Sequence, residues 1–291
     1  MMKVDIPLKR HPMLSVAIPA SLVSDVPHLR EKTSKIGFVG RALAMFRVDE
    51  VIVYPDISAQ TQVGDIELVA TILSYLETPQ YLRKALFKIR PELSYSGILP
   101  PLRTRHHPLR NREKDLEIGE FREGVVVSRT KDAVLVDIGV EHPALIFNEN
   151  VAENTRVTVK ITEKGKQLKA QLAKPEDVKI YWGYKVTVSN KLLGRMLKDR
   201  HFDLIIATSR FGEPFMNVVD KIRIKWNESK NVLVAFGAPA KGLHKILKQE
   251  NLNLADLADF IVNTVPNQAT ETVRTEEALY ATLAALNLMA P

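Results

Sequence analysis

The residues best suited to bind a ligand lie in two polar stretches near the end of the chain. The apolar run 260–262 opens into Asn263-Thr264-Val265-Pro266-Asn267-Gln268, and a second polar run covers 270–277. In open α/β folds, ligands bind beyond the carboxyl ends of the strands, where loop side chains and backbone groups converge. This loop is therefore a candidate ligand site. The alternative is a capped turn, in which Thr275 is the N-cap of a final helix with the apolar stripe Leu279, Leu283 and Leu286.

A glycine turn supplies the second candidate. The segment 234–243 has the pattern of a strand, a turn and a helix, and it contains Gly237 and Gly242. Glycine has no Cβ, so a backbone at these positions can approach a ligand closely. Such turns are routine in α/β proteins. The Asn263 loop strengthens the interpretation of this turn as part of a ligand site. Parallel strands can present both loops at one edge of a sheet, and we expect them to share a crevice.

Composition limits the chemistry that the chain can perform. It has 291 residues with 45% hydrophobic content, enough for one large or two ordinary domains. The absence of cysteine excludes disulfides, thiolate nucleophiles and cysteine-ligated zinc, and the seven histidines have no metal-binding spacing. The N-terminal residues lack a signal-peptide core and no apolar run is long enough to cross a bilayer, so we expect a cytoplasmic protein. The net charge of +7 suits a polyanionic partner.

The apolar pattern predicts a parallel α/β sheet. A strand at 14–19, a helix whose Ile36, Val39, Leu43 and Phe46 recur at helical spacing, and a strand at 50–54 form a βαβ unit. Further helical patterns cover 66–73 and 81–87. The alternation of strand and helix patterns returns after Pro175, with strands at 185–188, 202–207, 232–236 and 260–262 and a helix at 192–199.

The middle of the chain has a different pattern. Short strand-like runs at near-regular spacing predict a small β-barrel of OB type, with strands at 124–127, 133–139, 144–147, 156–161 and 167–172. The proline-rich basic segment 95–115 resists regular structure and is interpreted as the connection into this insertion. The predicted domains are therefore 1–94, 95–174 and 175–291, with the barrel splitting the α/β domain.

Several arginines in this connection are candidate RNA contacts. Beside a barrel that often binds single strands, cations can contact phosphates, and the candidates are Arg103, Arg105, Arg110 and Arg112. Solvated linker charge is the alternative. Phe121 and Phe147 are the barrel rings available for stacking. The run Val136-Asp137-Ile138-Gly139 has the acidic and glycine residues of a nucleotide site, but without further glycines or a following helix it is interpreted as a barrel strand.

Together these segments resemble the SPOUT class of S-adenosylmethionine-dependent RNA methyltransferases, and in particular the archaeal and eukaryotic RNA uridine-N3 methyltransferase family. The resemblance covers essentially the whole chain. It rests on 35–42 with 46–51, on 99–104, on Phe236-Gly237-Ala238-Pro239, and on 263–268 with 272–278. The most specific part is the Asn-Thr-x-Pro-x-Gln pattern followed by Arg-Thr-Glu-Glu. One departure is Ala269, where relatives are expected to have glycine; either its methyl group tightens the loop or the backbone angle there suits alanine.

The resemblance implies a C-terminal trefoil knot, S-adenosylmethionine as methyl donor, and a homodimer formed through the knotted domain. The residues that it implies around the donor are Phe236, Gly237, Gly242, Asn263, Val265, Gln268, Thr272 and Val273.

The acceptor that the resemblance implies is N3 of a uridine in large-subunit ribosomal RNA. Arg41 and Arg274 are then the candidate catalytic residues, because a cation can orient the base or stabilise a uridine anion. Arg41 points away from the apolar stripe of its helix and by itself would be a surface arginine. The resemblance implies a site formed across a two-fold dimer, in which Arg41 could serve the partner's donor site. No residue is identified as the proton acceptor. The alternatives are a non-catalytic RNA-binding factor in ribosome assembly and a 2′-O-ribose methyltransferase.

Overall fold

The computed structural model describes residues 7–199 and 201–290, which form two compact units. The sheet unit comprises Arg10–Leu76, Glu92–Pro101 and 183–290, and the barrel unit comprises 7–9, Glu77–Pro91 and Leu102–Trp182. Residues 77–91 thus pack with the barrel, whereas 92–101 pack with the sheet. The domain boundaries at 94/95 and 174/175 stay a prediction.

The sheet unit is built on six parallel strands in the order β11-β9-β10-β1-β2-β8. The chain places β2 and β8 on one side of β1 and places β10, β9 and β11 on the other, so the strand order reverses next to β1. This confirms the predicted parallel α/β sheet. The strands are β1 (Met13–Pro19), β2 (Glu50–Tyr54), β8 (Lys185–Val188), β9 (Leu204–Pro214), β10 (Asn231–Ala235) and β11 (Phe260–Asn263).

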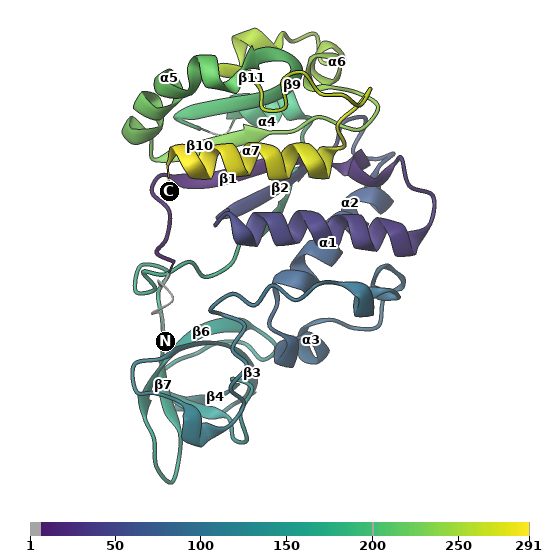
Figure 1. Cartoon of the computed structure of the whole chain (residues 1–291). Helices are drawn as coiled ribbons and strands as arrows, with labels where there is room; N and C mark the ends of the chain where they lie inside the picture. Colours follow the sequence, from purple (N-terminus) through teal and green to yellow (C-terminus); the bar gives the residue numbers. More distant parts are fainter. Residues whose placement is uncertain (1–6, 200, 291) are drawn as a thin grey trace. The chain divides into compact units, whose positions relative to one another are not determined.

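Helices cover both faces of this sheet. On one face, Leu193, Leu197, Ile246 and Leu247 from α4 and α6 pack in one core with Ala17, Ile52 and Leu233 of the strands. Figure 1 shows α7 (yellow) and α1 (purple) side by side in front of the sheet. The helices of the unit are α1 (Leu29–Met45), α2 (Val63–Glu77), α4 (Leu193–Asp199), α5 (Phe215–Glu228), α6 (Leu243–Lys248) and α7 (Thr275–Met289).

Helix α5 was missed by the sequence prediction, although its signal is present. Phe215, Val218, Ile222 and Trp226 are its buried residues, and their spacing of three to four places them on one face of a helix. The helix connects β9 to β10, and its apolar face packs against β9 and β11. Helix α5 therefore belongs to the helical layer that supports β9 and β11.

The barrel unit is a closed five-stranded barrel with the order β3-β4-β5-β7-β6, in agreement with the predicted runs. Its core contains Val126, Val134, Val136, Val159 and Ile161. Val136 and Asp137 belong to the barrel strand β4, as predicted, but the strand ends there and does not include Ile138 and Gly139. The elements are α3 (Gln80–Leu86), β3 (Phe121–Arg129), β4 (Ala133–Asp137), β5 (Ala144–Phe147), β6 (Arg156–Glu163) and β7 (Lys169–Leu172).

The proline-rich segment has no α-helix or strand over 95–115, as predicted, but it is not a free linker. His106 is fully buried, and its Nε2 lies 3.0 Å from Glu77 Oε1. Arg156 donates to Glu77 Oε2 at 2.6 Å and to Glu123 Oε2 at 2.6 Å. Burial alone would raise the pKa of Glu77, but the hydrogen bond from His106 and the charge of Arg156 hold that pKa below its usual value. This network fastens the segment to the barrel.

We predict that Arg156→Ala destabilises the barrel unit by about 3 kcal/mol, because Glu77 and Glu123 would be left buried without their cation. The measurement is the free energy of unfolding in denaturant. Lys169→Ala is the matched control, since Lys169 pairs with Glu163 on the surface and the loss of an exposed pair costs about 1 kcal/mol or less. Equal effects of the two substitutions would contradict the prediction.

Candidate functional site

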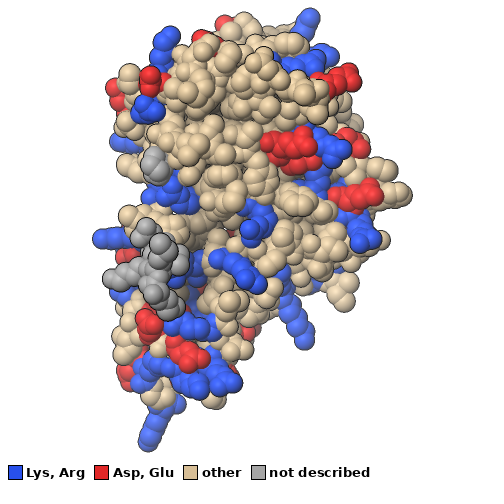
Figure 2. All heavy atoms as spheres, viewed as in Figure 1, with Lys and Arg blue, Asp and Glu red and all other residues tan. Residues whose placement is uncertain are grey.

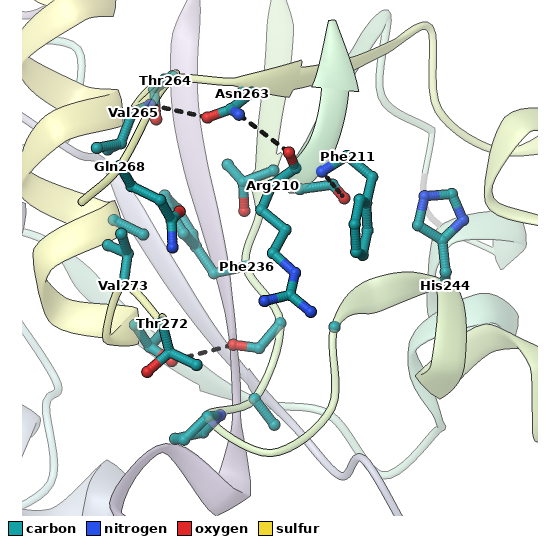
Figure 3. A pocket seen from close by; sticks show the side chains of 18 of the residues that line it. Arg210, Phe211, Phe236, His244, Asn263, Thr264, Val265, Gln268, Thr272 and Val273 are labelled. Carbon is teal, nitrogen blue, oxygen red and sulfur yellow. Dashed lines mark hydrogen bonds between the residues drawn. The ribbon is translucent and has the colours of Figure 1, made fainter. Parts of the chain in front are cut away.

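One cavity of about 280 Å³ lies at the carboxyl ends of β9, β10 and β11 in the sheet unit. It brings together the glycine turn and the Asn263 loop, which the sequence predicted to share a crevice (Figure 3). All of the residues predicted to contact the donor line it, namely Phe236, Gly237, Gly242, Asn263, Val265, Gln268, Thr272 and Val273. Their role as donor ligands stays a prediction.

Hydrogen bonds hold the glycine turn closed on this cavity. Tyr54 of β2 donates to the carbonyl oxygen of Phe236 at 2.6 Å. Complete burial raises the pKa of Tyr54 well above its usual value, so the hydroxyl stays a donor. A Cβ on Gly237 would lie 3.0 Å from Gly242 Cα and 3.0 Å from the Leu243 nitrogen. Only a residue without a side chain fits this turn without displacing backbone.

The Asn263 side chain fixes the second loop. Its Nδ2 donates to the carbonyl oxygen of Arg210 at 3.0 Å, and its Oδ1 accepts from the Val265 nitrogen at 2.9 Å. One asparagine thus joins β9 to the loop after β11, as Figure 3 shows. Further along, Gln268 Nε2 donates to the carbonyl oxygens of Thr270 and Glu271 at 2.9 and 3.2 Å.

The backbone explains why alanine is tolerated at position 269. Among the described residues of this loop, the left-handed angle falls on Asn267, with φ of 57°, and not on Ala269. Asparagine is one of the residues that adopt this conformation most readily. The glycine expected from the resemblance is therefore not required by the backbone here, which favours the second of the two explanations for Ala269.

The prediction that Thr275 is the N-cap of the final helix is wrong by one residue. Arg274 occupies the N-cap, and its backbone nitrogen donates to Glu277 Oε2 at 2.9 Å. Thr275 is buried inside the first turn, and its Oγ1 donates to the carbonyl oxygen of Gly237 at 3.1 Å. The start of α7 is thus tied directly to the glycine turn. The predicted helix start is thus confirmed to within one residue, and the ligand-site interpretation of this segment stays a prediction.

The sequence prediction missed the third wall of the cavity. It ended a strand at Ala207, because the polar residues that follow interrupt the apolar run, whereas β9 extends to Pro214. Arg210 and Phe211 from this extension line the cavity, as do His244 and Lys245 from α6. The sequence signal that could have revealed this wall was the polar residues after Ala207, because they follow a third strand of the same sheet. The Arg210 guanidinium carbon lies 4.7 Å from the centre of the Phe211 ring, and its Nη1 donates to the Glu271 carbonyl oxygen at 3.2 Å.

The predicted catalytic arginines do not line this cavity. Arg41 is on α1, and its Nη1 donates to the carbonyl oxygen of Pro101 at 2.7 Å. It shares one face of α1 with the exposed side chains of Phe38 and Met45, since positions three and four apart are neighbours on a helix. Arg274 is exposed at the start of α7, between two residues that line the cavity.

The predicted RNA contacts belong to the barrel unit and are exposed, namely Arg103, Arg105, Arg110 and Arg112. Arg110 is already paired, with Nη1 lying 3.1 Å from Glu117 Oε1 and Nη2 lying 3.5 Å from Glu120 Oε2. Its charge is therefore partly compensated. The remaining arginines of the set are better placed by charge to meet a polyanion.

The part of the chain that the structure describes contains neither a metal-binding cluster nor a membrane-spanning helix. Within 7–199 and 201–290, no cluster of three or more histidine, aspartate or glutamate side chains is arranged to hold a metal ion. None of the helices over the same residues combines the length and the apolar character that a membrane crossing requires.

The chain belongs to an RNA methyltransferase family, described as "Putative RNA methyltransferase", which matches residues 13–286. It is 35% identical to an uncharacterized protein of Haloarcula marismortui, over 94% of this chain and 98% of that protein. It is 33% identical to the 28S rRNA (uridine-N(3))-methyltransferase of Mus musculus, over 94% of this chain and 75% of the relative. The Homo sapiens enzyme of the same description is also 33% identical, over 94% of this chain and 77% of that enzyme. These matches confirm the family resemblance.

We predict that Thr275→Val lowers the free energy of unfolding by about 1 kcal/mol, because the carbonyl oxygen of Gly237 loses its side-chain donor. The change keeps the shape of the side chain, so thermal unfolding isolates the hydrogen bond. Thr275→Ser, which retains the hydroxyl, is the control and is expected to be closer to the unsubstituted protein. If serine proved more damaging than valine, the hydrogen bond would not be what fixes the start of α7.

Proposed function

We propose that this protein transfers a methyl group from S-adenosylmethionine to N3 of a uridine in large-subunit ribosomal RNA. The observation that carries the proposal is the single cavity in which all of the predicted donor contacts meet. The relatives described as 28S rRNA (uridine-N(3))-methyltransferases support the choice of acceptor. The fold proposed for the sheet unit is the trefoil-knotted SPOUT fold, and the proposed location is the cytoplasm.

The cavity wall fits an adenosine-containing donor. Phe236, Val262, Val265 and Val273 offer apolar surface to a base, while Asn263 and Gln268 are among the polar groups beside them. The crowded turn at Gly237 keeps bare backbone at the wall, where a side chain would intrude. When bound, the donor supplies an electrophilic methyl group on a sulfonium. The protein must then hold the acceptor in line with that methyl group and exclude water.

A uridine acceptor sets two further requirements. The base must leave any stack to be reached, and its N3 proton must be lost as the new bond to carbon forms. The negative charge that develops on the uridine needs a nearby cation. Arg41 and Arg274 are proposed for this role. The proton acceptor is left unassigned, because no side chain of the cavity is singled out for it.

In a homodimer formed through α1 and α7, Arg41 could act at the donor site of the partner subunit. Phe38 and Met45 on α1 are each 54% exposed and Leu288 on α7 is 84% exposed, so these two adjacent helices present apolar side chains to solvent. Figure 2 shows few charged side chains over the outer surface of α7, whose acidic residues Glu276 and Glu277 are at its first turn. Arg41 lies among these residues and outside its own cavity, so we propose that it acts on the donor site of the partner.

The barrel is proposed to be an OB-type RNA-binding domain. Its five-stranded closed connectivity is that expected of the type, and OB folds commonly bind single-stranded nucleic acids. Arg103, Arg105, Arg110 and Arg112 are the proposed phosphate contacts.

We predict that the protein transfers labelled methyl from S-adenosylmethionine to large-subunit ribosomal RNA and that nucleoside analysis identifies 3-methyluridine. Arg41→Ala is expected to lower the rate about a hundredfold, the effect of removing a charge-stabilising donor, while calorimetry shows little change in donor affinity. Arg30→Ala is the control, because Arg30 is an exposed arginine of the same helix.

The outcomes of this experiment separate the alternatives. RNA that binds but stays unmodified at saturating donor, with no heat of donor binding, would identify a non-catalytic RNA-binding factor. A methylated ribose would keep the donor assignment and replace uridine N3 as the acceptor. Equal rates for Arg41→Ala and Arg30→Ala would remove Arg41 from the mechanism.

We predict that the protein is a dimer by light scattering and that Phe38→Glu converts it to a monomer, because the substitution buries a charge in the apolar face of α1. The control is Ile224→Glu, since Ile224 is 63% exposed on α5 of the same unit. A monomeric unsubstituted protein, or a Phe38→Glu variant that remains dimeric, would refute dimerisation through this face.

A further inference from the structure

We infer that the rim of the cavity, formed by Arg210, Phe211, His244 and Lys245, is the docking site for the acceptor nucleotide of single-stranded RNA. This inference rests on the proposed function, because it assigns the inner wall to the methyl donor and the rim to the second substrate. None of these rim residues was among the predicted donor or RNA contacts. Both substrates must reach one place for methyl transfer, so a second binding surface has to adjoin the first.

Charge separates the rim from the rest of the cavity. Among the described residues that line the cavity, the arginine and lysine side chains are Arg210 and Lys245, and none of these residues is an aspartate or a glutamate. S-adenosylmethionine carries a sulfonium, an ammonium and a carboxylate, so its own net charge is positive and cations on the wall oppose its binding. A phosphate-bearing ligand is attracted by the same cations. The rim therefore suits RNA better than it suits the donor.

The exposed ring of Phe211 supplies the second argument. Phe211 is 78% exposed although it belongs to a strand that borders the cavity, so the ring contributes little to the core. Figure 3 shows this ring between the guanidinium of Arg210 and the imidazole of His244. Exposed aromatic rings beside cations are the usual platform for an unstacked base, because every base has a π face. A flipped uridine could stack there with its phosphates near Arg210 and Lys245.

The backbone holds this platform in a fixed position. Asn263 Nδ2 bonds to the carbonyl oxygen of Arg210, and the Phe211 nitrogen donates to Ser209 Oγ at 3.2 Å. The Arg210 guanidinium also contacts the Glu271 carbonyl oxygen, on the loop that supplies Thr272 and Val273 to the inner wall. The nucleotide platform and the donor wall are thus connected through Asn263 and Arg210.

Photocrosslinking tests the location. The full chain is saturated with S-adenosylhomocysteine, mixed with a short oligouridylate that contains 4-thiouridine, irradiated and digested with trypsin. We expect a crosslinked peptide 211–221, which begins at Phe211 because trypsin cleaves after Arg210. Crosslinks confined to the barrel unit would overturn the inference. That result would leave the proposed methyl transfer untouched, since donor binding and methylation are measured separately.

Substitutions test the roles of the side chains. Phe211→Ala is expected to weaken oligouridylate binding about tenfold, within the range for the loss of one stacked base, and Phe211→Tyr to restore it. Donor affinity, measured by calorimetry, should change less than about twofold in both variants. Loss of donor and RNA affinity together would overturn the inference, because the rim would then belong to the donor site.

Salt dependence tests the cations. Arg210→Ala and Lys245→Ala should each reduce the slope of log affinity against log salt concentration by about 0.7, the value for one lost contact to a single strand. Arg223→Ala is the control, since Arg223 is an exposed arginine of α5 that pairs with Asp220. Slopes that are unchanged in the rim variants, or reduced equally in the control, would show that the rim does not hold phosphates.

Discussion

The feature on which the candidate site depends is the shared direction of β9, β10 and β11. Because these neighbouring strands are parallel, the loops that follow them emerge at one edge of the sheet. Antiparallel strands would send adjacent loops to opposite edges, and no common cavity would form. Segments separated by more than fifty residues along the chain, at Arg210 and Asn263, therefore lie within hydrogen-bonding distance.

A small number of hydrogen bonds then converts this proximity into a defined cavity. Tyr54 holds the Phe236 carbonyl, Thr275 holds the Gly237 carbonyl, and Asn263 holds the Arg210 carbonyl. In each pair a side chain of one segment bonds to the backbone of another, so each loop is positioned by its neighbour. Loops held in this way can present backbone groups to a ligand with little ordering on binding, which favours affinity.

The two units have different sources of stability. The sheet unit buries apolar strands between helices, and its polar groups gather at one edge. The barrel unit adds a buried ionic network, in which Glu77, His106 and Arg156 attach the basic segment to the strands. With that segment fastened, its exposed arginines have a defined place on the barrel.

The parallel sheet, the inserted barrel and the residues of two cavity walls could be predicted from the amino-acid pattern alone. These follow from local signals, namely apolar periodicity, the glycine turn and the polar loop after Val262. The third wall depends on the tertiary structure, because the polar end of β9 has no local signature of a strand and its last residues, Glu213 and Pro214, pair with β11. The role of Thr275, whose hydroxyl bonds to a distant carbonyl, and the burial of His106 also depend on the tertiary structure. Such contacts join residues far apart in the chain, and no periodicity or spacing encodes them.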